Sequence, residues 1–161
     1  MNEIKINLGC GPDIRPNYIN SDILGGDVKC DLRKFPWPWP DNYADEILMW
    51  HVLEHLPDTY ATAHEIHRIL KPGGKFWGQV PYGFSEPSFF HPQHCRYFIE
   101  SSFVTLAEHT DFKLVKAELV SLNLTLQHKI RNLLPFRMVL KKFILNMYDV
   151  VDFEMRKPQA H

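Results

Sequence analysis

The apolar residues of this 161-residue chain fall into short blocks with the period of a strand or of a helix. Blocks of strand type are residues 4–8, a block ending at Asp22, and then 28–30, 45–50, 75–80, 112–120 and 148–156. Helical periods cover 58–70, a stretch capped by Ser101 or Ser102 that runs to about Thr110, and 127–146, which Pro135 could interrupt. Strands that alternate with helices and turns predict one α/β domain with a mostly parallel sheet.

The clearest helix is 58–70, where Asp58 can cap the first turn and Lys71-Pro72-Gly73-Gly74 would end it with a turn. Its predicted core-facing residues are Tyr60, Ala63, Ile66, Ile69 and Leu70. Prolines at alternate positions make 35–40 an extended loop. Residues 81–98 form a long loop rich in aromatic residues and histidine, and such loops in compact domains are often functional.

The first strand runs straight into Gly9-Cys10-Gly11, and the second strand ends at Asp22. Glycine at the end of a parallel strand lets a ligand touch the backbone, and a carboxylate on the next strand can accept hydrogen bonds from two ribose hydroxyls. The ten residues between Gly11 and Asp22 leave no room for a full crossover helix. Folds that bind dinucleotides hold the pyrophosphate at the N-terminus of that helix. The pattern therefore favours a ribose-bearing cofactor without phosphate, such as S-adenosylmethionine.

Five motifs stand in a familiar order: N-L-G-C-G at 7–11, N-S-D at 20–22, D-L-R-K-F-P-W-P at 31–38, H-V-L-E-H-L at 51–56 and L-K-P-G-G at 70–74. Along nearly its whole length the chain resembles the small Rossmann-like (class I) S-adenosylmethionine-dependent methyltransferases of the methyltransferase domain group. The resemblance implies a single domain over 1–161, with a mostly parallel seven-stranded sheet. Its last strand would be antiparallel and inserted between its neighbours, after a helical insertion at 121–147. The first crossover helix would be missing or reduced.

The resemblance also assigns cofactor-binding positions. It implies that Gly9, Cys10 and Gly11 lie against the methionine part of the cofactor and that Asp22 binds the ribose. It places Asp31 and Leu32 beside the adenine and His51 next to the sulfonium. Asn7 stands where many members carry an acid that contacts the glycine loop; its amide can still donate or accept hydrogen bonds.

Histidines supply the candidate catalytic residues. Methyl transfer mainly needs alignment in a dry site, with a base only where the acceptor must lose a proton. His51 and His55 follow the fourth strand and could act as a base or orient the acceptor; the alternative is a simply polar helix start. His91 and His94 in the 81–98 loop, together with Tyr82, would form the acceptor side; the alternative is a loop that only covers the core.

We predict no metal site, because His51, His55, His91, His94 and Cys95 have a suitable composition but no ligand spacing. Three widely spaced cysteines argue against a disulfide framework. No stretch is long and apolar enough to cross a membrane, and we expect a cytoplasmic protein. A net charge of −1 offers no general attraction to nucleic acid.

The basic, amphipathic segment Leu133–Met147, with Arg137, Lys141 and Lys142, could pack as a lid, form a homodimer, bind a partner protein or lie on a membrane. The function predicted for the whole chain is S-adenosylmethionine-dependent methyl transfer to a small-molecule or saccharide-like acceptor. Two alternatives stay open: a non-catalytic S-adenosylmethionine-binding partner subunit, and a nucleotide-dependent oxidoreductase, which the missing phosphate-binding helix disfavours.

Overall fold

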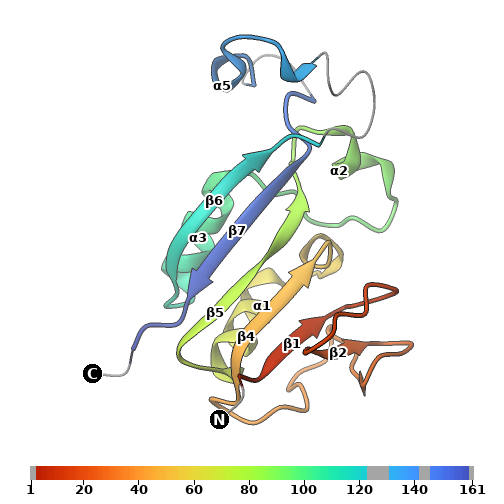
Figure 1. Ribbon diagram of the computed structural model, residues 1–161, viewed down its shortest axis with the longest axis vertical. Helices are drawn as coiled ribbons and strands as arrows, with labels where there is room; N and C mark the ends of the chain where they lie inside the picture. The colour runs from red at the N-terminus through yellow and green to blue at the C-terminus, as the bar shows by residue number, and fades with distance from the viewer. Residues whose placement is uncertain (1–2, 123–130, 142–145, 160–161) are drawn as a thin grey trace.

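The computed structural model describes residues 3–122, 131–141 and 146–159. The elements in chain order are β1 Lys5–Leu8, β2 Ile19–Asp22, β3 Val28–Lys29, β4 Ala44–Trp50, the 3-10 helix η1 Leu53–His55, α1 Thr59–Ile69, β5 Leu70–Pro81, α2 Glu86–Phe90, α3 Glu100–His109, β6 Lys113–Val120, α5 Arg137–Leu140 and β7 Val150–Arg156. They build a seven-stranded sheet in the order β3-β2-β1-β4-β5-β7-β6 (Figure 1). β7 is antiparallel to β5 and β6 and lies between them, which confirms the predicted Rossmann-like methyltransferase fold.

The segment between β1 and β2 contains no helix, as predicted. Side chains on the two strands hold it instead. The Asn7 amide donates to the carbonyl of Asp13 at 2.8 Å and to Oδ1 of Asn20 at 3.1 Å. The same Asn20 oxygen accepts the backbone N–H of Arg15 at 2.9 Å. Two buried amides therefore satisfy the backbone of a segment that lacks helical hydrogen bonds.

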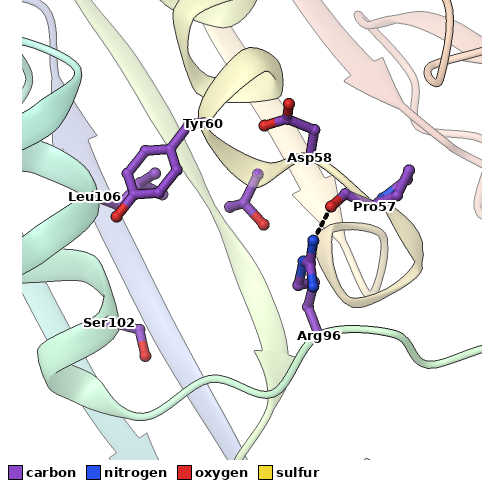
Figure 2. A pocket seen from close by; sticks show the side chains of 7 residues that line it. Pro57, Asp58, Tyr60, Arg96, Ser102 and Leu106 are labelled. Atoms are coloured by element: carbon purple, nitrogen blue, oxygen red, sulfur yellow. Dashed lines mark hydrogen bonds between the residues drawn. The ribbon is translucent and has the colours of Figure 1, made fainter.

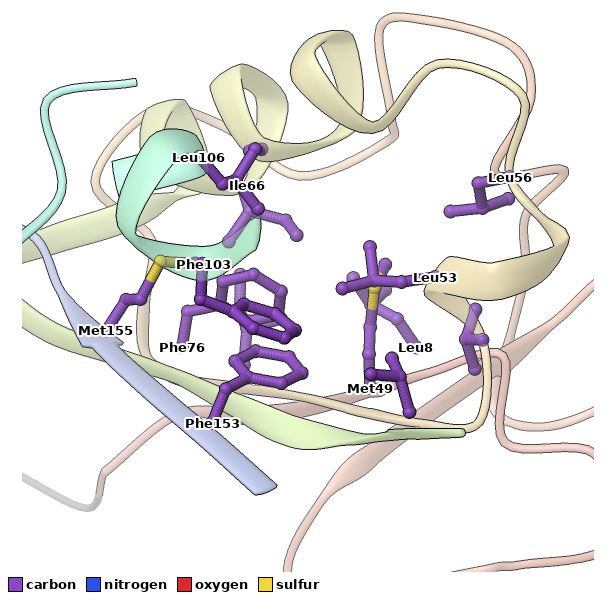
Figure 3. Packing of buried hydrophobic residues seen from close by; sticks show 14 of the residues in the cluster. Leu8, Met49, Leu53, Leu56, Ile66, Phe76, Phe103, Leu106, Phe153 and Met155 are labelled. Atoms are coloured by element: carbon purple, nitrogen blue, oxygen red, sulfur yellow. The ribbon is translucent and has the colours of Figure 1, made fainter. Parts of the chain in front are cut away.

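The main apolar core lies between the sheet and helices α1 and α3, both of which are behind the sheet in Figure 1. In this layer the Phe103 and Phe153 rings stack with centroids 4.3 Å apart, and Phe76 meets Phe153 edge-on at 5.0 Å. Figure 3 shows these rings with Ile66 of α1 and Leu106 of α3. Each such fully buried side chain contributes about 1.5–3 kcal/mol to folding, so this layer holds the strands whose ends form the site.

Side chains of the strands and of the segment before β2 cover the opposite face of β4 and β5. The Arg15 guanidinium lies over the rings of Trp50 and Trp77, at 5.3 and 5.9 Å from their centroids. The indole N–H of Trp77 donates to Glu46 at 2.7 Å, and the Tyr18 hydroxyl donates to the same carboxylate. These contacts fasten the helix-free segment to the sheet.

Most predicted elements are confirmed, and the differences have local causes. Ala63, Ile66 and Ile69 are buried as predicted, but Tyr60 is exposed, and the buried face of α1 also includes Thr62 and Glu65. Glu65 is buried there because it accepts the backbone N–H of Trp37 at 2.7 Å and pairs with Arg68. The turn predicted at 71–74 is wrong: β5 already begins at Leu70, which pairs with Ala44 before the register shifts.

Two further differences concern helices. Inside the predicted loop 81–98 the structure has the short helix α2. α3 begins at Glu100, one residue before the first predicted cap, and Ser102 acts from inside the helix by accepting the N–H of Ile99 at 3.0 Å.

The predicted helix 127–146 lies partly outside the described residues. Within the described part, helical residues 131–132 and α5 are separated around Pro135, as expected. Arg137 stacks on the Tyr148 ring at 4.5 Å, and Lys141 pairs with Glu100, so these two cations face the protein; Lys142 is outside the described residues. In the part of the chain that is described, no helix has the length and apolar character needed to cross a membrane.

Candidate functional site

The carboxyl ends of β1, β2, β3 and β4 meet at one edge of the sheet because these strands are parallel neighbours. Backbone hydrogen bonds continue past the strand ends. Cys10 donates to the carbonyl of Ser21 at 3.0 Å, and Cys30 donates to the carbonyl of Asp22 at 3.1 Å. The glycine loop, Asp22 and Asp31 therefore lie side by side, where ligands bind in open parallel sheets.

The two glycines of the loop have different surroundings. Both have positive φ, +66° at Gly9 and +48° at Gly11, which L side chains rarely adopt. A Cβ at Gly9 would lie 2.7 Å from the Val52 side chain, whereas a Cβ at Gly11 would meet nothing within 4 Å. Gly9 therefore packs the loop against the segment after β4, and Gly11 leaves open space beside the backbone.

Asp22 is fixed by the loops on both sides of it. Its Oδ2 accepts the N–H of Gly11 and its Oδ1 accepts the N–H of Leu24, each at 3.0 Å. A carboxylate has about four lone-pair sites, so each oxygen can take one more donor. Two hydroxyls on neighbouring ribose carbons would supply those donors, and the open space at Gly11 adjoins them. These residues fit a ribose-bearing cofactor.

The two residues predicted to lie beside the adenine, Asp31 and Leu32, are less accessible to a ligand than Gly11 is. Arg33 donates to both carboxylate oxygens of Asp31, at 2.8 and 3.1 Å, and these hydrogen bonds lower the Asp31 pKa to about 2. Leu32 belongs to the buried apolar core and can present only an edge to a ligand. Cys10 is also buried, and burial together with the nearby Asp22 charge raises the pKa of its thiol. Cys10 therefore stays protonated, as a packed residue rather than a nucleophile.

Asn7 is buried beneath the loop and directs its amide nitrogen to Asp13 and Asn20. The structure thus places this predicted cofactor residue as a support of the glycine loop. Direct contact of Asn7 with a cofactor stays a prediction.

His51 follows β4 at the same edge with φ +55°, a left-handed conformation that is unusual for a residue other than glycine. Its Nδ1 lies 3.2 Å from Oε1 of Glu54, and its Nε2 lies 3.1 Å from Oε1 of Gln79. The Gln79 amide is oriented by its own donation to Asp152 at 2.6 Å. Both ring nitrogens therefore face acceptors, and the ring can take a proton from a substrate only after giving up one of these contacts. The side chain is 38% exposed, which leaves its face open to a ligand.

The other three predicted catalytic histidines lie close to one another. One nitrogen each of His55, His91 and His94 lies within 4.8 Å of the others. Cys95 is exposed, and its Sγ faces the carbonyl of Glu54 at 3.5 Å. Tyr82 is buried in the core, and burial raises the pKa of its phenol. Its place on the acceptor side stays a prediction.

A cavity of about 410 Å³ lies between the N-terminal ends of α1 and α3 (Figure 2). It is lined by Pro57, Asp58, Thr59, Tyr60, Arg96, Ser102 and Leu106. Arg96 closes one side of it by donating to the carbonyl of Pro57. None of the predicted cofactor residues lines this cavity.

Glu54, Gln79 and Asp152 complete the surroundings of His51. Glu54 is 1% exposed, and its Oε2 has no hydrogen-bond partner among the described residues. Gln79 and Asp152 come from β5 and β7, which pair only in the folded sheet. A polar residue at the end of a buried strand was the one signal that could have marked Gln79.

We expect Gly9→Ala to lower the free energy of unfolding by about 2–4 kcal/mol, because the methyl group must displace Val52 and sit at positive φ. Gly11→Ala has space around its new methyl group and should cost only the backbone strain, about 1–2 kcal/mol. Urea unfolding of the two variants measures the difference. Equal losses would contradict the different surroundings of the two glycines.

Comparisons with known proteins agree with this geometry. The family model described as a methyltransferase domain matches residues 9–117, more than half of the chain. The ubiquinone/menaquinone biosynthesis C-methyltransferase UbiE of Cupriavidus taiwanensis is 32% identical over 75 residues, which are 47% of this chain and 28% of that protein. The matched part of the chain thus spans less than a third of this curated relative's length.

Solved structures share the fold over nearly the whole chain. A SAM-dependent methyltransferase from Archaeoglobus fulgidus superposes with a TM-score of 0.69 at 17% identity, over 96% of this chain and 86% of that one. The [4+2]-cyclase SpnF superposes with a TM-score of 0.70 at 15% identity, over 98% of this chain and 75% of that one. The second likeness shows that the shared fold alone does not specify the reaction.

Proposed function

We propose that this chain, which belongs to the methyltransferase domain family of class I S-adenosylmethionine-dependent methyltransferases, transfers the methyl group of S-adenosylmethionine to a small polar acceptor. The acceptor would be a saccharide-like molecule, for example, and it would bind at the sheet edge formed by β1, β2 and β4. The observation that carries this proposal is the juxtaposition of Asp22, the open backbone at Gly11 and the exposed face of His51. The first two fit a nucleoside, and the third lies one strand farther along the same edge.

Each residue has a limited task in this proposal. When bound, S-adenosylmethionine supplies a methyl group on a sulfonium that needs no further activation. Asp22 would hold the ribose hydroxyls, and the Gly11 backbone would let the cofactor approach. His51, oriented by Glu54 and Gln79, would contact the acceptor and fix its position. Alignment of this kind is what methyl transfer chiefly requires.

The polar surroundings of His51 support a polar acceptor. Glu54, Gln79 and Asp152 form a hydrogen-bonded network with it, and such a wall suits hydroxyl or amine groups better than a bare hydrocarbon. The net charge of −1 also argues for a small molecule over nucleic acid. We further propose a cytoplasmic location, in keeping with three free cysteines.

Cofactor titration tests the proposal. By isothermal titration we expect S-adenosylmethionine and S-adenosylhomocysteine to bind at least about tenfold more tightly than NAD, because the segment between β1 and β2, which the structure describes in full, has no helix for a pyrophosphate. Tighter binding of NAD would overturn the proposal in favour of an oxidoreductase.

Turnover separates an enzyme from a binding subunit. A panel of hydroxyl, amine and carboxylate compounds would be screened for release of S-adenosylhomocysteine, with the Asp22→Ala variant as the background control. Tight cofactor binding without turnover across the panel would favour a non-catalytic subunit that acts through a partner protein.

A further inference from the structure

His55, His91 and His94 come from two separate segments and meet in space. His55 ends η1, while His91 and His94 lie between α2 and α3. The ring centroids are 4.8 Å apart for His55 and His94, 5.2 Å for His91 and His94, and 5.3 Å for His55 and His91. All three side chains are partly buried, and one nitrogen of each lies within 4.8 Å of the others. We propose that this three-histidine cluster is a binding site for a divalent transition metal of the zinc type.

The hydrogen bonds of two of these rings leave a nitrogen available for a metal. Nδ1 of His94 lies 2.9 Å from the carbonyl of Ser88, and Nδ1 of His55 lies 3.4 Å from the carbonyl of Gln93. A carbonyl only accepts, so each Nδ1 carries the proton and each Nε2 keeps a free lone pair. Metal-binding histidines are usually oriented in this way.

His91 has to rearrange to complete the site. Its Nδ1 accepts the backbone N–H of Gln93 at 3.3 Å, which leaves the proton of the neutral ring on Nε2. Loss of this long contact frees the ring to turn or to exchange its proton. Bonds of 2.0–2.1 Å in a tetrahedral site require nitrogens about 3.4 Å apart, so nitrogens that now lie within 4.8 Å of one another must approach by up to about 1.4 Å. Side-chain rotation alone covers such a distance.

The electrostatic surroundings also suit a metal. Burial lowers the pKa of His55, and the adjacent His94 and His91 act in the same direction, although the Glu54 charge and the hydrogen bond to Gln93 oppose it. Neutral imidazoles are the ligands that zinc, copper and nickel prefer, whereas magnesium and calcium need oxygen ligands. Three protein ligands leave a fourth position open for water or a small ligand.

A metal here would fasten the loop after α2 to η1. The loop already rests on η1, because the backbone N–H groups of Cys95 and Arg96 donate to the carbonyl of Glu54 at 2.9 and 3.2 Å. The carboxylate of the same Glu54 contacts His51. The metal would thus stabilise the backbone that positions the Glu54–His51 pair, and this proposal does not depend on the reaction that the protein catalyses.

Metal titration of the untagged, chelator-treated protein tests the proposal. We expect one equivalent of Zn²⁺ to bind in competition with a chromophoric chelator and to raise the melting temperature, whereas Mg²⁺ should do neither. Co²⁺ should give the visible absorption of a low-coordinate nitrogen site. Binding of Mg²⁺ in place of Zn²⁺, or no binding of Zn²⁺, would overturn the proposal.

Substitutions of single histidines test which residues bind the metal. His94→Ala and His55→Ala should each weaken Zn²⁺ binding by at least about a hundredfold, more than the loss of a supporting residue around a metal ligand costs. The matched control His64→Ala removes an exposed histidine of α1 and should bind Zn²⁺ as the unaltered chain does. If His55→Ala fails to fold, His94→Gln in the loop still decides the question. Unchanged affinity in the His94 variant would place the metal elsewhere and refute the site.

Discussion

Asp22→Ala should weaken the binding of S-adenosylmethionine by about 10–150-fold. The substitution removes the acceptors for two ribose hydroxyls, and hydrogen bonds to a charged group contribute about 1.5–3 kcal/mol. The loss should be equal for S-adenosylmethionine and S-adenosylhomocysteine, because both carry the same ribose. Isothermal titration with each ligand measures it.

Two companion variants make this result specific. Asp22→Asn keeps the shape of the side chain but only one acceptor oxygen for the N–H groups of Gly11 and Leu24, and it should fall between the unaltered chain and Asp22→Ala. Asp13→Asn removes a charge from the same segment, where the carboxylate pairs with Arg15, and it should leave affinity unchanged. A thermal melt establishes that each variant is folded. Unchanged affinity in a folded Asp22→Ala would mean that the ribose binds elsewhere.

Much of the fold could be predicted from the sequence, because the strands follow apolar blocks and their order follows the resemblance. The helix-free segment after Gly11 was also predictable, since only ten residues separate Gly11 from Asp22. The start of β5 at Leu70, in place of the predicted turn at 71–74, was not predictable, because the pairing of Leu70 with Ala44 is a contact between distant parts of the chain. Tyr60 was misplaced because a tyrosine fits an apolar face by type, whereas its position on α1 is exposed in the folded protein.

Part of the candidate site could likewise be predicted from the sequence, and part could not. Gly9, Gly11 and Asp22 lie in continuous motifs at strand ends, so their meeting follows from parallel pairing alone. Glu54 is close to His51 in the sequence, but Gln79 and Asp152 come from β5 and β7, and no sequence pattern predicts that they meet His51. The three-histidine cluster has no ligand spacing either, because His55 is brought to His91 and His94 by the packing of a loop on η1.

His51→Asn should lower turnover with the acceptor by about a hundredfold or more, while the affinity for S-adenosylmethionine changes little. Asparagine tolerates the left-handed backbone conformation that His51 adopts, so the change removes the imidazole without straining the end of β4. Turnover is measured by release of S-adenosylhomocysteine once the panel has identified an acceptor. Affinity is measured by titration on the same preparation.

The comparison of these two quantities decides the role of His51. Asp22 and His51 lie at the ends of strands separated by β1, so a loss at Asp22 should appear mainly in cofactor affinity and a loss at His51 mainly in turnover. Glu54→Gln keeps the volume of the buried side chain but removes its charge. If Glu54 orients His51, turnover should also fall in Glu54→Gln, although by less than in His51→Asn. His109→Ala, on the exposed end of α3, serves as the control for histidine removal. Equal losses of turnover and affinity in His51→Asn would make His51 a cofactor ligand, and full activity would remove it from the site.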